Sequence, residues 1–241
     1  FSAQIFFDFA GYSTCAIGAA LCLGFVLPDN FRFPYAAVGF SDFWRRWHIS
    51  LSTWLRDYLY IPLGGSRHGA WRTTRNQFLT FLLGGLWHGA GWTFILWGAF
   101  HGASLAIERR LGPRWSRRSA DGAGAAASPA WPVLALRRIG VFQWVCVSWI
   151  LFRSQTLADA GALFRSLGDW SRPATLWTPA VLTVLTVGWL VQFLDGSRLE
   201  PVWNRFGRLP APVQGVLCAF ALALILGLGP QGVAPFIYFQ F

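Results

Sequence analysis

The sequence predicts an all-helical fold, a polytopic bundle of helices that crosses a membrane several times. Two observations lead to this fold class. The chain is 54% hydrophobic and only 12% charged, whereas soluble domains carry roughly 25% charged residues. It also contains long runs without any Asp, Glu, Lys or Arg, namely Phe9–Pro28, Asn76–Ile107, Pro173–Leu194 and Pro212–Phe241. An apolar run of about 18 residues or more is long enough to cross a bilayer as a helix.

The basic residues are all arginine, and they gather between the apolar runs. Seven lie from Arg32 to Arg75 and five from Arg109 to Arg118. Positive charge in short connections is typical of the cytoplasmic side of a membrane protein. The net charge of +10 therefore indicates contact with a lipid bilayer and not with nucleic acid, and the apolar hairpin between the two clusters is expected to enter and leave on one side.

The expected helices follow the apolar runs in order. The first lies near 9–27, after Asp8 and before Pro28. Later helices are expected near 76–88, 91–110, 133–152, 177–194 and 213–229, with a flexible loop rich in Gly, Ala and Ser at 112–130. The chain has no methionine, so we expect it to be a piece of a longer protein, the C-terminal part by the resemblance described below, and to form a single membrane domain over 1–241. The four cysteines lie in apolar segments, where we expect them to be small core residues.

The segment 41–60 has a different pattern, typical of one amphipathic helix at the membrane interface. Large apolar residues such as Phe43, Trp47 and Leu51 fall on one arc, and Arg and Ser residues fall on the other. Ser41 and Asp42 supply an N-cap, and Pro62 ends the helix. His48 lies at the edge of the apolar arc, so the interpretation is open between an interfacial packing residue and a site residue that faces the bundle.

The run Asn76–Ile107 is the most informative segment. Its 32 residues would extend about 48 Å as one helix, against a hydrocarbon core of about 30 Å. We therefore predict two helices that meet at a bend at Gly89–Gly91, with His88 at the bend. An ionisable residue at membrane depth is a functional-site hypothesis by default. An apolar environment disfavours the charged imidazolium, so the ring stays neutral and able to act as a general base.

Other assignments of the histidines were weighed. A metal site needs three or four converging ligands, and no acidic residue lies between 57 and 108, so we expect no metal. His101 on the second apolar helix is either a hydrogen-bonded packing residue or a supporting site residue. His68 lies in a polar loop and is not expected to take part in chemistry.

Three segments carry a resemblance to a known family: Phe43–Gly65, Gly85–Ala90 and Trp97–Gly102. They strongly resemble the membrane-bound O-acyltransferases, most closely the bacterial branch that includes alginate O-acetyltransferases of exopolysaccharide biosynthesis. The ending Phe236–Phe241 also resembles that branch. By this resemblance, His88 matches the essential histidine and His48 the second site position. The resemblance also implies a helical bundle pierced by a central tunnel, in the cytoplasmic (inner) membrane of a bacterium.

The resemblance implies acyl transfer from a cytoplasmic thioester such as acetyl-CoA, with no bound cofactor. Acyl groups would go outward to a polysaccharide acceptor, directly or through a periplasmic or extracellular partner protein. Oxyanion donors would be Trp87, His48 or an amide near Gly89, with Trp47 as a further supporting residue. The donor phosphates would be attracted by Arg45, Arg46 and Arg56, which are equally explained as cytoplasmic anchors. The alternative function is a transporter or lipid flippase that uses buried histidines as a proton relay.

Overall fold

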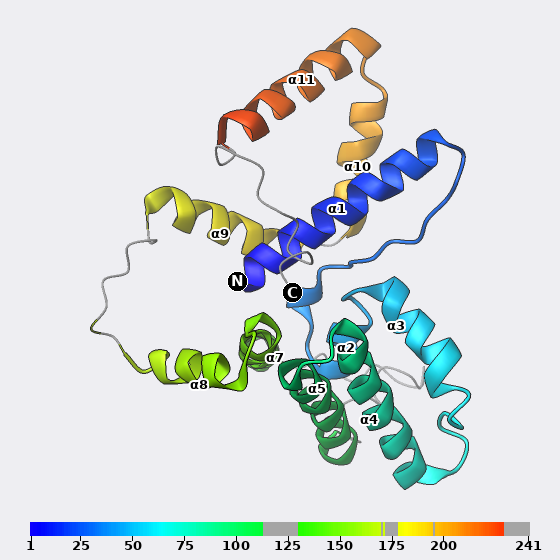
Figure 1. The fold of residues 1–241 in the computed structure, drawn as a ribbon. Helices are drawn as coiled ribbons and strands as arrows, with labels where there is room; N and C mark the ends of the chain where they lie inside the picture. Colours follow the sequence, from blue (N-terminus) through cyan, green and yellow to red (C-terminus); the bar gives the residue numbers. More distant parts are fainter. Residues whose placement is uncertain (113–129, 170, 172–177, 195, 229–241) are drawn as a thin grey trace. The chain divides into compact units, whose positions relative to one another are not determined.

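The computed structural model describes residues 1–112, 130–169, 171, 178–194 and 196–228 (Figure 1). These residues form helices and no strand, which confirms the predicted all-helical class. The chain divides into two compact units, Phe1–Gln192 and Phe193–Gln240, each described by itself. The single domain over 1–241 stays a prediction. The loop 112–130, apart from its two end residues, and the segment 236–241 lie outside the described residues.

The first unit holds every element that carries a predicted site residue. Its elements are α1 (Ser2–Cys22), η1 (Pro34–Ala36), α2 (Phe40–Trp44), α3 (Ile49–Leu55), η2 (Arg56–Tyr60, a π-helix), α4 (Gly69–His88), α5 (Trp92–Leu111), α7 (Trp131–Arg153), α8 (Leu157–Ser166) and α9 (Pro179–Val191). The second unit contains α10 (Gly196–Gly207) and α11 (Ala211–Leu228). By length and composition, α1 and α7 are the described helices that qualify as candidate membrane spans.

Helix α1 differs from the helix expected near 9–27, because it starts at Ser2 and ends at Cys22. Its end is set by Gly24, which has a φ of 84°. The amide of Gly24 donates to the carbonyl of Leu21 at 3.0 Å, and the amide of Phe25 donates to Ala20 at 2.8 Å. These two bonds form a Schellman motif, which ends a helix at a glycine. The helix therefore stops before Pro28, the residue on which the sequence-based boundary rested.

Helices α4 and α5 form the predicted hairpin, and its break at Gly89–Gly91 is confirmed. Helix α4 begins at Gly69, earlier than the expected 76–88. The two helices pack through glycines, since a Cβ on Gly85 would meet the carbonyl of Phe94 and a Cβ on Gly98 that of Phe81. Small residues at such a contact let two backbones approach closely. Gly85 therefore serves helix packing.

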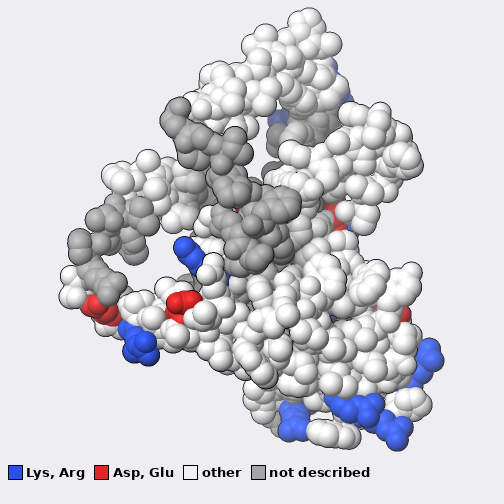
Figure 2. Space-filling model, in the orientation of Figure 1, with Lys and Arg blue, Asp and Glu red and all other residues white. Residues whose placement is uncertain are grey.

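The arginines near this hairpin gather at its open end. Because α4 and α5 run side by side in opposite directions, the start of α4 and the end of α5 lie together (Figure 1). Figure 2 shows basic side chains gathered at that edge of the molecule, with few charges on the rest of the visible face. The ends meeting there carry Arg67 and Arg72 on one side and Arg109 and Arg110 on the other. This arrangement is the one that the positive-inside pattern predicts for a hairpin.

The single amphipathic helix predicted over 41–60 is wrong. Helix α2 ends at Trp44, and α3 begins at Ile49 after His48, whose φ of 44° lies in the left-handed region. Both short helices have starts that are capped by distant residues. The carboxylate of Glu108 accepts the amide hydrogens of Phe40 and Ser41 at 2.8 Å each and so caps α2. Asn30 caps the start of α3, as described below. Local periodicity carries no information about caps that come from distant segments.

The core of the first unit is an aromatic cluster around Trp47, whose side chain is 2% exposed. Its ring lies 5.0 Å from the rings of Phe31 and Trp149 and 5.7 Å from that of Phe43. These contacts join α2 and α7 to the segment that precedes η1. The cluster fixes the loop 45–48 against α7, and with it the backbone that carries His48.

Candidate functional site

His88 is the last residue of α4 and lies among aromatic rings. The centroid of its ring is 5.1 Å from that of Phe152, 5.3 Å from Trp97 and 5.0 Å from Trp87. Its side chain is partly exposed. The turn that follows requires glycine at 89, because a Cβ there would lie 2.7 Å from the ring of Phe94. The end of the helix and its aromatic neighbours thus hold His88 at the bend, as predicted.

A cavity of about 550 Å³ reaches His88. It lies between the α2–α3–η2 segment on one side and α4 and α5 on the other, and Gly84 contributes to its wall. Drug-sized ligands occupy pockets of about 300–1,000 Å³, so this volume is sufficient for part of a substrate. Other residues that line it include Trp44, Arg45, Arg56, Gln77 and Trp97.

Three of the lining residues contain buried polar atoms that have no hydrogen-bond partner within the described part of the chain. They are the indole nitrogens of Trp44 and Trp97 and the side-chain oxygen of Gln77. Buried polar groups in proteins are nearly always paired, so each exception needs an explanation. A bound polar group in the cavity would supply such partners.

His48 lies in the turn before α3 and is not part of the cavity lining that the structure describes. The two imidazoles are close enough to interact electrostatically. The Nδ1 atom of His48 lies 3.1 Å from Oδ1 of Asn30, and its ring packs edge-on against Phe9 at 4.7 Å. The structure therefore places the two histidines within electrostatic range of each other. That His48 faces the same cavity as His88 stays a prediction.

The structure places two of the supporting residues in the packed core. Trp47 is the centre of the aromatic cluster and does not line the cavity. His101 is 1% exposed, and its Nε2 atom lies 3.0 Å from Oγ of Ser148. Its ring packs edge-on against Trp97 at 4.9 Å. Both residues support the site through packing. His101 is therefore the hydrogen-bonded packing residue, which was one of its two possible assignments.

The expected oxyanion donors at the bend are placed less favourably. Trp87 is 62% exposed and does not line the cavity. The amide of Gly89 donates to the carbonyl of Leu86 at 3.2 Å, so it is already used in the helix end.

The three arginines of the expected donor site separate into two groups. Arg45 and Arg56 line the cavity and are exposed. Arg46 does not line it and instead bonds the carboxylate of Asp42 at 2.8 Å, which stabilises the turn after α2. A hydrogen bond from Arg56 lowers the pKa of the Asp57 carboxyl, so Asp57 stays ionised and offsets part of the Arg56 charge.

Sequence reasoning missed three polar residues near the histidines. Arg32 and Gln77 line the cavity, and Asn30 holds His48. Arg32 and Asn30 lie in a connection without periodicity, so only contacts across the fold identify them. Among the described residues, no group of three or more His, Cys, Asp or Glu side chains is arranged to hold a metal ion.

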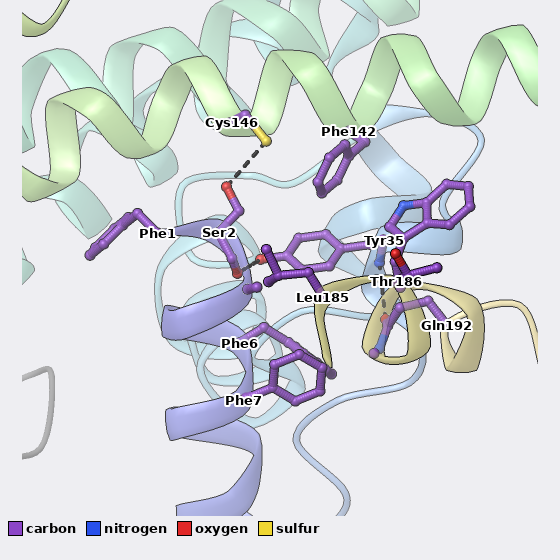
Figure 3. Close-up of a pocket in the computed structure, with 13 residues that line it drawn as sticks. Phe1, Ser2, Phe6, Phe7, Tyr35, Phe142, Cys146, Leu185, Thr186 and Gln192 are labelled. Atoms are coloured by element: carbon purple, nitrogen blue, oxygen red, sulfur yellow. Dashed lines mark hydrogen bonds between the residues drawn. The ribbon is translucent and has the colours of Figure 1, made fainter. Parts of the chain in front are cut away.

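A second cavity of about 440 Å³ lies between α1, α7 and α9 (Figure 3). It is lined mainly by apolar side chains, and none of the histidines contributes to it. Figure 3 shows the Tyr35 hydroxyl donating to the carbonyl of Ser2 at 2.5 Å, and the Ser2 hydroxyl directed to Sγ of Cys146 at 3.1 Å. The polar groups of this cavity that Figure 3 labels with dashed lines are thus bonded to one another.

Comparison with known proteins agrees with this geometry. The sequence model of the membrane-bound O-acyltransferase family matches residues 1–152, which include both histidines and the α4–α5 hairpin. The chain is 41% identical to the probable alginate O-acetylase AlgI of Pseudomonas putida, over 100% of this chain and 52% of that protein.

Two further relatives have names that refer to other polymers. The peptidoglycan O-acetyltransferase of Helicobacter pylori is 42% identical over 66% of this chain and 28% of its own length. The teichoic acid D-alanyltransferase of Bacillus subtilis is 32% identical over 63% of this chain and 39% of its own length. The chain thus spans about half the length, or less, of these relatives. With more than half of its residues matched by the family model, the chain belongs to the membrane-bound O-acyltransferase family.

Proposed function

We propose that this chain carries the acyl-transfer site of an integral-membrane O-acyltransferase. The enzyme moves an acyl group, by our proposal acetyl, from a cytoplasmic thioester toward hydroxyls of an extracytoplasmic polysaccharide. The observation that carries the proposal is His88 at the helix break, at the wall of a cavity of about 550 Å³. The names of the relatives, which modify alginate, peptidoglycan and teichoic acid, support a polymer outside the membrane as the acceptor.

In the proposed reaction, neutral His88 takes the proton from the acceptor hydroxyl while its oxygen attacks the thioester carbonyl. The tetrahedral intermediate then collapses, the carbon–sulfur bond breaks, and the thiolate leaves with the proton from the imidazolium. The aromatic rings around His88 favour its neutral form, because they exclude water. Of the lining residues, Trp97 has a buried indole nitrogen without a partner, which makes it a better candidate for an oxyanion donor than the exposed Trp87.

The donor side of the cavity is marked by arginine. Arg45 and Arg56 line it, and guanidinium groups bind phosphates well. This arrangement supports a phosphate-bearing donor such as acetyl-CoA entering from the cytoplasmic side of a bacterial inner membrane. The acyl group then passes to the polymer directly or through a partner protein outside the membrane.

The test is the substitution His88→Gln in the full-length protein. Glutamine keeps a polar side chain of similar reach but cannot take the proton, and general base catalysis contributes about 10²–10⁴ in rate. We expect loss of detectable polymer acetylation, with expression and membrane insertion unchanged. Near-normal acetylation by the glutamine variant would show that His88 is a packing residue.

A further inference from the structure

Asn30 makes an unusual set of contacts with the loop that carries His48. Its carbonyl oxygen Oδ1 lies 3.1 Å from Nδ1 of His48, 2.9 Å from Oγ of Ser50 and 3.3 Å from the amide nitrogen of Ser50. Its side-chain nitrogen donates to Oγ of Ser13 in α1 at 3.1 Å. Its backbone carbonyl accepts the amide hydrogen of Ile49 at 3.0 Å. Asn30 thus holds the first amides of α3 and the His48 ring together.

The backbone of His48 depends on this clamp. A non-glycine residue in the left-handed region is uncommon, and such strain persists where the surroundings hold it and is frequent at functional sites. Asn30 bonds the two amides that follow His48, that of Ile49 through its backbone carbonyl and that of Ser50 through its side-chain oxygen. Because His48 has this left-handed conformation, its ring does not take the position that it would have in a continuous helix.

The same contacts fix the orientation of the Asn30 amide. A backbone N–H can only donate, so the atom that faces the amide of Ser50 must be the oxygen. His48 Nδ1 faces that same oxygen, and two lone pairs would repel each other at 3.1 Å. The Nδ1 atom must therefore carry a proton and donate it. In a neutral imidazole only one nitrogen is protonated, so Nε2 is left with its lone pair.

We infer that Asn30 is a positioning residue that sets the tautomer of His48, with the proton on Nδ1 and a proton-accepting Nε2. The role in acyl transfer that this inference gives to His48 rests on the proposed function, in which the site at His88 transfers the acyl group. It makes neutral His48 a proton acceptor in the site, and it excludes neutral His48 as an oxyanion donor through Nε2. It also assigns a role to a residue that lies 18 positions away in the sequence.

The test is made on the full-length protein with ¹⁵N-labelled histidine. The ¹⁵N chemical shifts of an imidazole distinguish a protonated from an unprotonated nitrogen, and the His48→Gln variant identifies the His48 signals. We expect His48 to carry its proton on Nδ1 in the unchanged protein. We expect Asn30→Asp to keep this tautomer and substantial activity, because a carboxylate still accepts the Nδ1 proton.

For Asn30→Ala we expect a mixture of tautomers and a fall in kcat of about 10–100-fold, as for other residues that orient an active histidine or ligand, with little change in KM. The matched control is Ser13→Ala, which removes the bond of the Asn30 side-chain nitrogen and should leave the tautomer and kcat unchanged.

The inference is overturned if His48 of the unchanged protein carries its proton on Nε2. It is also overturned if Asn30→Ala lowers activity while the tautomer is unchanged, or if Asn30→Asp retains the tautomer but is as inactive as alanine. If Asn30→Ala does not fold, the spectra of the unchanged protein and of Asn30→Asp decide. A normal rate for His48→Gln with the Nδ1 tautomer in place would refute the proposed role of His48 in catalysis and leave its positioning by Asn30 intact.

Discussion

Glu108 near the end of α5 holds the start of α2, and its removal should loosen the cavity wall. Its carboxylate accepts the amide hydrogens of Phe40 and Ser41 at 2.8 Å each and the Ser41 hydroxyl at 2.6 Å. Helix α2 carries Trp44, and Arg45 follows it, so both lining residues depend on this anchor. We predict that Glu108→Ala destabilises the protein and lowers acyl transfer.

The magnitude follows from the bonds lost. Three hydrogen bonds to a charged acceptor contribute at most about 5–9 kcal/mol. Glu108 is only partly buried, so water replaces part of each bond, and the loss of an N-cap alone costs about 0.5–2 kcal/mol. We therefore expect about 2–4 kcal/mol for Glu108→Ala. Glu108→Gln keeps one accepting oxygen and should cost about half as much.

The assay is thermal unfolding of the purified full-length protein, followed by tryptophan fluorescence. The entropy of unfolding grows with chain length, so for a full-length protein about twice as long as this chain, 2–4 kcal/mol lowers the midpoint by about 2–4 °C by the scaling of soluble proteins. The matched control is Glu200→Gln, at an exposed glutamate of α10, which should leave the midpoint unchanged. An equal midpoint for Glu108→Ala and the control would refute the reasoning, because it would mean that the three bonds contribute nothing net.

Three further predictions concern the hairpin and the site. Gly98→Ala places a Cβ against the carbonyl of Phe81 and should cost about 1–3 kcal/mol through overpacking; Gly140→Ala in α7, where a Cβ meets nothing within 4 Å, should be neutral or stabilising in the same unfolding assay. Replacing both Arg45 and Arg56 by Gln should raise the KM for the thioester donor by about 2–30-fold, at 0.2–1 kcal/mol for each exposed ion pair, with little change in kcat; an unchanged KM at low salt contradicts their role, and Arg205→Gln is the control. His48→Ala should lower acyl transfer by about 10–100-fold, less than the His88 variants; a loss as large as theirs would mean that His48 is the principal base.

The sequence predicted the α4–α5 hairpin because its causes are local. The charge-free run is too long for one crossing, and the glycines at 89 and 91 lie beside each other where the chain turns. His88 could be identified for the same reason, since an ionisable residue in such a run is visible without a structure. Helix α8 also had a local signal that went unused: Thr156 and Asp159 form a capping box, which marks a helix start.

The segment 41–60 could not be predicted in the same way, because its shape is set from outside. Phe43 and Trp47 on the predicted apolar arc are buried, yet Trp54 and Tyr58 on the same arc are 51% and 69% exposed. The pattern assumes a continuous helix, whereas the cap from Asn30 stabilises a second helix start after His48 and the cap from Glu108 holds the start of α2. Both caps join positions far apart in the sequence, so their effect appears only in the folded chain.

This break has a consequence for the chemistry of the site. In a continuous helix the amides of Ile49 and Ser50 would bond the carbonyls four residues before them, and His48 would have no anchor on the side of α1. The left-handed turn frees both amides, and Asn30 accepts them together with the Nδ1 proton of His48. Asn30 thereby accepts the hydrogen bonds of the free amides at the start of α3 and also orients the imidazole of His48. The interruption of the helix that the local sequence favours is therefore what allows His48 to be held in one tautomer.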